Sequence, residues 1–178
     1  MSPYLLREHS ARLTENLRNR LDIGNFSCVA GYMANDGEID LSRAFSWFHE
    51  NGITVAVPHF RKGEMRFARL TPQQQFVRGA FDILEPDRIE SVHLSSIDLM
   101  LLPLVAFSTT GNRLGRGGGH YDRMLEPESR PMTLGIAHEF QLNDEFSTKL
   151  TDVSLDAVVT EQQWRLFSAA AGKVLREN

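Results

Sequence analysis

A glycine-rich segment with two arginines is the part of this sequence best suited to chemistry. Residues 111–122 read Gly-Asn-Arg-Leu-Gly-Arg-Gly-Gly-Gly-His-Tyr-Asp, and four glycines stand close together at Gly115, Gly117, Gly118 and Gly119. Glycine allows positive φ and a close approach of the backbone to a ligand, and successive free N–H groups can bind an anion. Arg113 and Arg116 add forked donors that suit phosphate oxygens. The segment therefore predicts a phosphate-binding loop.

Two familiar phosphate motifs do not describe this loop. It has no Gly-Lys-Ser/Thr, so it is not a Walker A loop, and a G-x-G-x-x-G fingerprint would need glycine where His120 stands. A flexible surface loop is the simpler alternative, although glycines flanked by arginines after an apolar run argue against it. An RNA-binding box over 115–119 is a further alternative, which a single copy in an acidic chain does not favour.

Hydrophobic periodicity predicts the elements that position the loop. Ser2 and Pro3 begin a helix with an apolar stripe from Leu6 to Leu21. Asp40 caps a second helix that stops at 51–52, and a last amphipathic helix uses Trp164, Phe167, Ala171 and Leu175. The predicted strands are 26–33, 53–57 ending at Pro58, an edge strand 65–70, 99–107, 133–137 and 157–160.

Alternation of strands and helices predicts an α/β fold with one domain over residues 1–178. We expect a mainly parallel central sheet with helices on both faces, in a Rossmann-like three-layer sandwich. Ligands of such folds bind beyond the carboxyl ends of the strands. The loop follows the strongest predicted strand, 99–107, and so falls in that crevice.

Bulk properties narrow the classes of partner. The chain has 178 residues, a net charge of −4 and one cysteine, Cys28. This charge argues against broad binding to nucleic acid or to anionic membranes. A lone cysteine suits a reducing compartment, and neither a signal peptide nor a membrane span is visible. We expect a cytoplasmic protein that acts on small molecules without an obligate protein partner.

Residues 111–122 resemble the signature of the 5-formyltetrahydrofolate cyclo-ligase family, also called methenyltetrahydrofolate synthetases. The preceding Pro-Leu-Val-Ala-Phe, the segment Gly37-Glu-Ile-Asp40 and the segment Leu134-Gly-Ile-Ala-His-Glu139 agree with that family. The resemblance runs from the first helix to about Trp164. It implies that ATP phosphorylates the formyl oxygen of 5-formyltetrahydrofolate, a folate nitrogen attacks the activated carbon, and 5,10-methenyltetrahydrofolate, ADP and phosphate are released.

The resemblance also implies roles for individual residues. It places the nucleotide phosphates on Arg113, Leu114, Gly115, Arg116, Gly117, Gly118, Gly119, His120 and Tyr121, with Arg116 and Tyr121 as the catalytic pair. It places the folate on Met33, Glu38 and the stretch from Arg116 to His120, and Mg²⁺ on Asp122 and Asp152. Mg²⁺ commonly binds one or two protein carboxylates together with phosphate oxygens.

Four of these residues have a structural alternative. Asp122 can cap a helix, Asp152 can be a solvated loop residue, Glu38 can belong to a turn, and Met33 can belong to the core. The sequence also departs from the family, because His120 replaces an aromatic residue and a basic N-terminal helix that contacts ATP is not visible before Met1. The runner-up function is therefore a folate- or nucleotide-binding protein without turnover. In either case we expect the chain as given to fold but to bind ATP weakly.

Overall fold

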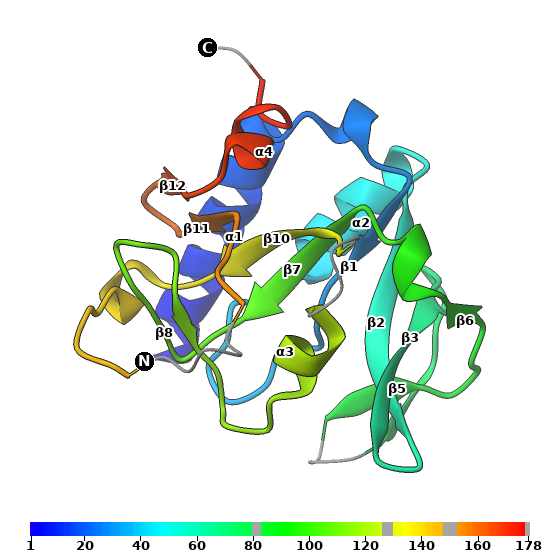
Figure 1. Cartoon of the computed structure of the whole chain (residues 1–178). Coiled ribbons are helices and arrows are strands. Elements are labelled where there is room, and N and C mark those ends of the chain that lie inside the picture. The colour runs from blue at the N-terminus through cyan, green and yellow to red at the C-terminus, as the bar shows by residue number, and fades with distance from the viewer. Residues whose placement is uncertain (80–82, 126–129, 148–152, 177–178) are drawn as a thin grey trace.

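A computed structural model describes residues 1–79, 83–125, 130–147 and 153–176. Its centre is an eight-stranded sheet in the order β12-β11-β10-β7-β1-β2-β3-β6 (Figure 1). The strands are β1 Cys28–Ala30, β2 Thr54–Arg61, β3 Glu64–Leu70, β6 Ser91–Val92, β7 Leu99–Pro103, β10 Met132–Ile136, β11 Ala157–Val159 and β12 Trp164–Leu166. Neighbours from β11 to β2 pair in parallel, whereas β12, β3 and β6 pair antiparallel. The predicted mainly parallel α/β sheet is confirmed.

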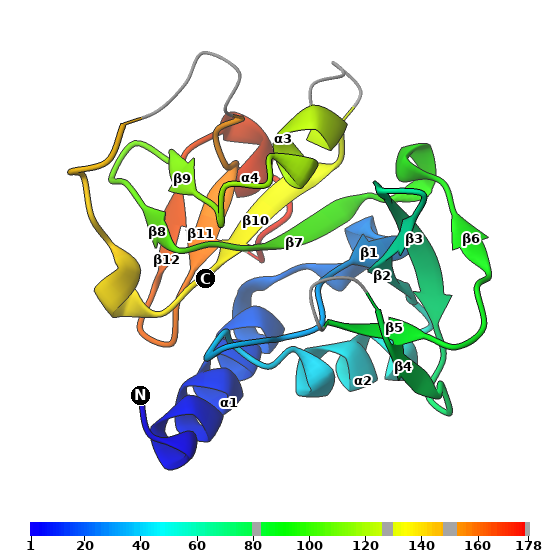
Figure 2. The same cartoon turned by 90° about the horizontal axis from the view of Figure 1, so that it is seen from below.

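Three helices cover one face of the sheet, as Figure 2 shows for α1 and α2. They are α1 Pro3–Arg20, α2 Ser42–Glu50 and α4 Ala169–Gly172. The predicted start of α1 is confirmed, because the Ser2 hydroxyl accepts a hydrogen bond from the Leu5 N–H at 3.2 Å. Leu13 and Leu17 of its apolar stripe are fully buried against the sheet. No helix in the described ranges is long and apolar enough to cross a membrane.

Short elements cover the opposite face. They are the helix α3 His120–Leu125, the hairpin of β8 Ala106–Phe107 with β9 Arg113–Leu114, and the 3-10 turn Leu94–Ser96. Leu125, Phe107 and Ile97 bury their side chains in a second core cluster there. A separate hairpin of β4 Phe76–Arg78 with β5 Leu84–Pro86 lies beside β2 and β3. The sandwich is thus uneven, with its thin face on the side of the glycine-rich loop.

Two strand boundaries were predicted wrongly. The strand expected over 26–33 is limited to Cys28–Ala30, and β2 continues through Pro58 to Arg61. Ala56 faces β1, since its carbonyl accepts from the Gly31 N–H. The backbone nitrogen of Pro58, two residues later, also points to the β1 side of the strand, but β1 has already ended at Ala30, opposite Ala56. Its missing N–H therefore removes no ladder hydrogen bond, and pairing with β3 continues. The strand predicted over 65–70 is confirmed as β3, although β6 rather than β3 forms the edge.

The chain also departs from prediction around the loop and at its C-terminal end. The strand expected over 99–107 divides into β7 and β8, because the Val105 N–H turns to donate to the Leu114 carbonyl. The segment predicted as the last amphipathic helix begins as a strand, with Trp164 paired to Val159 in the β12–β11 ladder. Only the four residues of α4 are helical, capped by Ser168. An apolar period of three to four residues does not distinguish a strand followed by one helical turn from a short helix.

Candidate active site

A cavity of about 720 Å³ opens at the carboxyl ends of β7, β1 and β2. Residues 113–123 form one wall, and Met33 and Glu38, which follow β1, form part of another. This is the edge at which parallel α/β sheets bind ligands. Its volume lies in the usual range for small-molecule sites. The predicted location of the loop is therefore confirmed by the geometry.

The backbone of the loop is available to a ligand. Gly117 and Gly119 have φ of 88° and 61°, in the left-handed region that side chains rarely adopt. The N–H groups of residues 115–119 donate to no described residue, and these residues are exposed or half-buried. The chain then enters α3, where the Arg123 N–H donates to the Gly119 carbonyl. Free, closely spaced N–H groups beside a cavity are suited to the oxygens of an anion.

Arg113 and Asp122 form an ion pair that joins β9 to α3. Their Nη2 and Oδ1 atoms lie 2.7 Å apart, and the Arg113 side chain is only 3% exposed. The guanidinium carbon also lies 5.8 Å from the centre of the Tyr121 ring, within cation–π range. Burial, and next the Glu38 carboxylate, raise the pKa of Tyr121, whereas Arg113 opposes the rise. Tyr121 is consequently a neutral hydrogen-bond donor at physiological pH.

Arg116 connects the loop to the segment that follows β1. Its Nη2 lies 3.3 Å from Glu38 Oε1, and its Nη1 lies 3.4 Å from Asp36 Oδ2. The Asn35 carbonyl also accepts from Nη2 at 3.4 Å. All of these contacts are long, and the Arg116 side chain is 53% exposed. A guanidinium held this loosely over the cavity can turn to an incoming anion.

Glu38 is a carboxylate in a half-closed environment. Its side chain is 17% exposed, and its Oε2 accepts from the Asn35 N–H at 3.0 Å. Burial raises the pKa of Glu38, while the Asn35 N–H and Arg116 oppose the rise. A partly desolvated carboxylate binds a pair of ligand N–H donors more strongly than a solvated one does.

An apolar wall completes the cavity. Phe60 packs edge-on against His120 with ring centres 5.1 Å apart. Met33 packs against the core, as its structural alternative predicted, and it also lines the cavity. Met65 and Pro58 extend this wall from β2 and β3. The combination of planar and thioether side chains suits a flat heterocycle.

The structure brings together nearly every site residue that the sequence predicted. Met33, Glu38 and all positions from Arg113 to Asp122 line the one cavity. Asp152 lies outside the described residues. Sequence reasoning missed Tyr32, Asn35 and Phe60, which also line it. Their signal was their place directly after β1 or late in β2, at the carboxyl edge where a parallel sheet binds its ligand.

One carboxylate of the cavity fits a magnesium ion bound together with phosphate. The Asp122 side chain is 24% exposed and borders the free N–H groups of the loop. Arg113 donates to its Oδ1, which leaves Oδ2 for a cation. Mg²⁺ needs only one or two protein carboxylates when phosphate oxygens and water complete its octahedron.

Comparison with known proteins gives one consistent result. The sequence model of the 5-formyltetrahydrofolate cyclo-ligase family matches residues 3–161. A 5-formyltetrahydrofolate cyclo-ligase of Escherichia coli strain K12 is 35% identical over 139 residues, covering 74% of this chain and 76% of the relative. One from Haemophilus influenzae is 31% identical over 159 residues, covering 84% and 85%.

Solved structures agree with these relatives. A 5,10-methenyltetrahydrofolate synthetase of Aquifex aeolicus superposes with a TM-score of 0.82 at 30% identity, covering 94% of this chain and 85% of its own. A second, from Mycoplasma pneumoniae, superposes with a TM-score of 0.70, covering 90% of each chain. At 22% identity this second likeness concerns the fold alone.

Proposed function

The chain belongs to the 5-formyltetrahydrofolate cyclo-ligase family, and from this premise we propose the roles of the residues that line the cavity. It is accordingly a ligase that converts 5-formyltetrahydrofolate to 5,10-methenyltetrahydrofolate with the use of ATP. The observation that carries the residue roles is the cavity itself. Free backbone N–H groups line one side of it, the half-buried carboxylate of Glu38 lines the other, and Arg116 lies between them.

The loop 115–119 holds the nucleotide phosphates in this proposal. Its free N–H groups supply fixed donors, which stabilise charge on phosphoryl oxygens without reorganisation. Phosphoryl transfer depends mainly on position and on neutralised charge, and little covalent chemistry is asked of the protein. The buried Arg113 keeps the two ends of the loop together through Asp122.

The folate occupies the side of the cavity formed by Glu38, Met33 and Phe60. The Glu38 carboxylate accepts hydrogen bonds from the donor edge of the pterin ring, and the apolar wall with His120 packs against its face. Arg116 exchanges its long contacts with Asp36 and Glu38 for the oxygen that receives the phosphoryl group. Tyr121, protonated and half-buried, donates a hydrogen bond to the same region.

Asp122 holds Mg²⁺ in this proposal, and the ion supplies positive charge that neutralises phosphate oxygens. The protein contributes the orientation of the carboxylate, which Arg113 fixes. We further propose that the enzyme works in the cytoplasm. The single cysteine, Cys28, is buried and free, and a lone free cysteine suits a reducing compartment.

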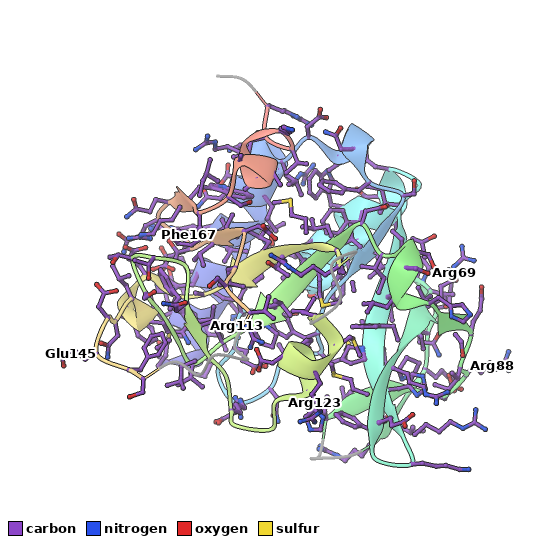
Figure 3. The ribbon with its side chains drawn as sticks, viewed as in Figure 1. Arg69, Arg88, Arg113, Arg123, Glu145 and Phe167 are labelled. Atoms are coloured by element: carbon purple, nitrogen blue, oxygen red, sulfur yellow. The ribbon has the colours of Figure 1, made fainter. Side chains whose placement is uncertain are left out.

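The test is formation of the methenyl product from 5-formyltetrahydrofolate and Mg-ATP, followed by its near-ultraviolet absorbance. Release of ADP is measured in the same samples, because a binding protein without turnover would retain both substrates unchanged. We expect Arg116→Ala to abolish most of the rate. An exposed arginine outside the cavity, Arg88, supplies the control Arg88→Ala (Figure 3). Equal rates for the two variants would contradict the assignment of Arg116.

A further inference from the structure

A second group of potential ligands lies outside the catalytic cavity. His9 of α1, His138 after β10 and Glu161 after β11 each offer one ligand atom, and these atoms all lie within 4.8 Å of one another. The Nδ1 atoms of His9 and His138 are 2.9 Å apart. His9 Nδ1 is 3.6 Å from Glu161 Oε1. None of these residues lines the cavity described above.

Neighbouring groups fix the orientation of two of the three. His138 Nε2 lies 3.1 Å from the Gly37 carbonyl, which can only accept, so Nε2 carries the proton and Nδ1 presents a lone pair. The Phe140 ring stacks on His138 with an interplanar angle of 7°. Glu161 Oε2 accepts from the Glu139 N–H at 3.0 Å, which turns Oε1 toward His9. Outer contacts of this kind are typical of histidine and carboxylate metal ligands.

Hydrogen bonding alone accounts for these residues incompletely. With His138 Nδ1 as acceptor, donation from the His9 Nδ1–H is the hydrogen bond that joins the two imidazoles. Glu161 is 8% exposed, and its Oε1 lies 3.6 Å from His9 Nδ1, a contact that is an ion pair only when His9 is protonated. A buried carboxylate is costly unless its charge is compensated. A divalent cation between the three ligand atoms would bind both imidazoles and Glu161 Oε1 together.

We propose that His9, His138 and Glu161 form a binding site for a divalent transition-metal ion of the zinc type. Imidazole and carboxylate ligands suit Zn²⁺ and its first-row neighbours better than Mg²⁺. Tetrahedral bonds of roughly 2.0–2.1 Å place neighbouring ligand atoms about 3.3–3.4 Å apart. Two of the three separations, 2.9 and 3.6 Å, lie within about half an ångström of that spacing, and the third, between His138 and Glu161, is at most 4.8 Å. Three protein ligands leave a position for water.

The ion would connect distant parts of the chain. His9 and His138 are 129 positions apart. The site joins α1 to the ends of two central strands. Through the Gly37 carbonyl it also supports the turn that precedes Glu38. Ion binding should therefore raise the melting temperature, since a ligand of the folded state alone stabilises that state.

The experiment titrates the chelator-treated full chain with Zn²⁺ by calorimetry and with Co²⁺ by visible absorbance, without ATP or folate. We expect one ion per chain and a Co²⁺ spectrum without thiolate charge-transfer bands. His9→Ala and Glu161→Gln should each weaken binding by more than about tenfold, since even outer partners of a ligand are worth about 10–100-fold. His93→Ala removes an exposed histidine elsewhere and should leave binding unchanged.

Several outcomes would overturn the proposal. One is the absence of stoichiometric binding to the wild-type chain, and another is unchanged affinity in both folded variants. If the Co²⁺ spectrum disappears in excess Mg²⁺, the ion sits at Asp122 and the proposal fails. Melting curves of the variants establish that they fold. If neither folds, the wild-type Co²⁺ spectrum decides, because bands of nitrogen and oxygen ligation support the site and a featureless spectrum refutes it.

Discussion

Replacement of Glu38 by glutamine should move folate affinity and protein stability in different directions. The variant keeps the shape of the side chain and an oxygen that accepts from the Asn35 N–H. It loses the negative charge of the carboxylate that, in the proposal, accepts hydrogen bonds from the pterin donors. A hydrogen bond to a charged group is worth about 1.5–3 kcal/mol, so the dissociation constant of 5-formyltetrahydrofolate should rise roughly ten- to a hundredfold.

Stability should remain equal or increase. Burial is the main reason that the pKa of Glu38 exceeds its ordinary value of 4.5, so folding disfavours the ionised form. The lost pairing with Arg116 is worth only about 0–1 kcal/mol, since that arginine is half exposed. A raised folded pKa contributes stability below pH 4.5 that is lost as the pH rises through the folded pKa. The stability of Glu38→Gln relative to the wild type should therefore increase as the pH rises above 4.5.

The assay pairs calorimetric titration of folate with melting curves from pH 4 to 8. The matched control is Asp36→Asn, because Asp36 also contacts Arg116 but is 80% exposed. Unchanged folate affinity in Glu38→Gln would remove Glu38 from the site. Equal losses in both variants would assign the effect to Arg116, and a melting temperature lowered by several degrees would refute the argument from burial.

Two further predictions test the loop, and a third tests the ion pair of Glu139 with Arg165. Asp122→Asn should lower ATP affinity about tenfold with Mg²⁺, the value of one charge-assisted contact, and less with chelator, because the asparagine Oδ1 can still accept from Arg113. Its melting temperature should fall, because the buried Arg113 loses a charged partner. Equal losses of ATP affinity with Mg²⁺ and with chelator would contradict a metal role. A methyl group at Gly117 would meet open space, but the φ there is 88°. Gly117→Ala should therefore strain the loop by about 1–2 kcal/mol and reduce ATP affinity. The control Gly172→Ala also meets open space but lacks the positive φ, so it should leave ATP affinity unchanged. Hydrogen bonds from Arg165 are the main cause that lowers the pKa of Glu139. The stability that the ionised Glu139 gives to the folded protein is therefore present above pH 4.5 and lost as the pH falls. Glu139→Gln should cost about 1–3 kcal/mol at pH 7 in urea unfolding, and a cost that does not shrink in acid would exclude the ionised pair.

The sequence predicted those elements whose signals are local. The cap at Ser2 and the stripe through Leu13 defined α1, and the long apolar run after Asp98 defined β7. Pro58 was misinterpreted because its cost depends on whether a neighbouring strand is present on that side, which only the assembled sheet decides. Trp164 was misassigned because the strand that it pairs with had to be located first.

The candidate site divides in the same way. The loop was predictable because glycine and arginine at close spacing are rare in ordinary core or surface segments. Phe60 was not, since an aromatic residue in a strand carries the same pattern whether it faces the core or a cavity. The cluster of His9, His138 and Glu161 had no sequence signal, because its members are brought together only by the packing of α1 against two strand ends.

Arg113 and Asp122 illustrate how a motif acquires roles that its residue types do not reveal. The sequence suggested a phosphate ligand and a metal ligand, acting separately. In the folded chain they bind each other, and Arg113 is almost completely enclosed, so its charge serves Asp122 and the Tyr121 ring. In the proposed function, direct contacts to phosphate then fall to the N–H groups of 115–119 and to Arg116. Because the pair fastens both ends of that loop, much of the entropy of ordering it is lost on folding, and less remains to be lost when ATP binds.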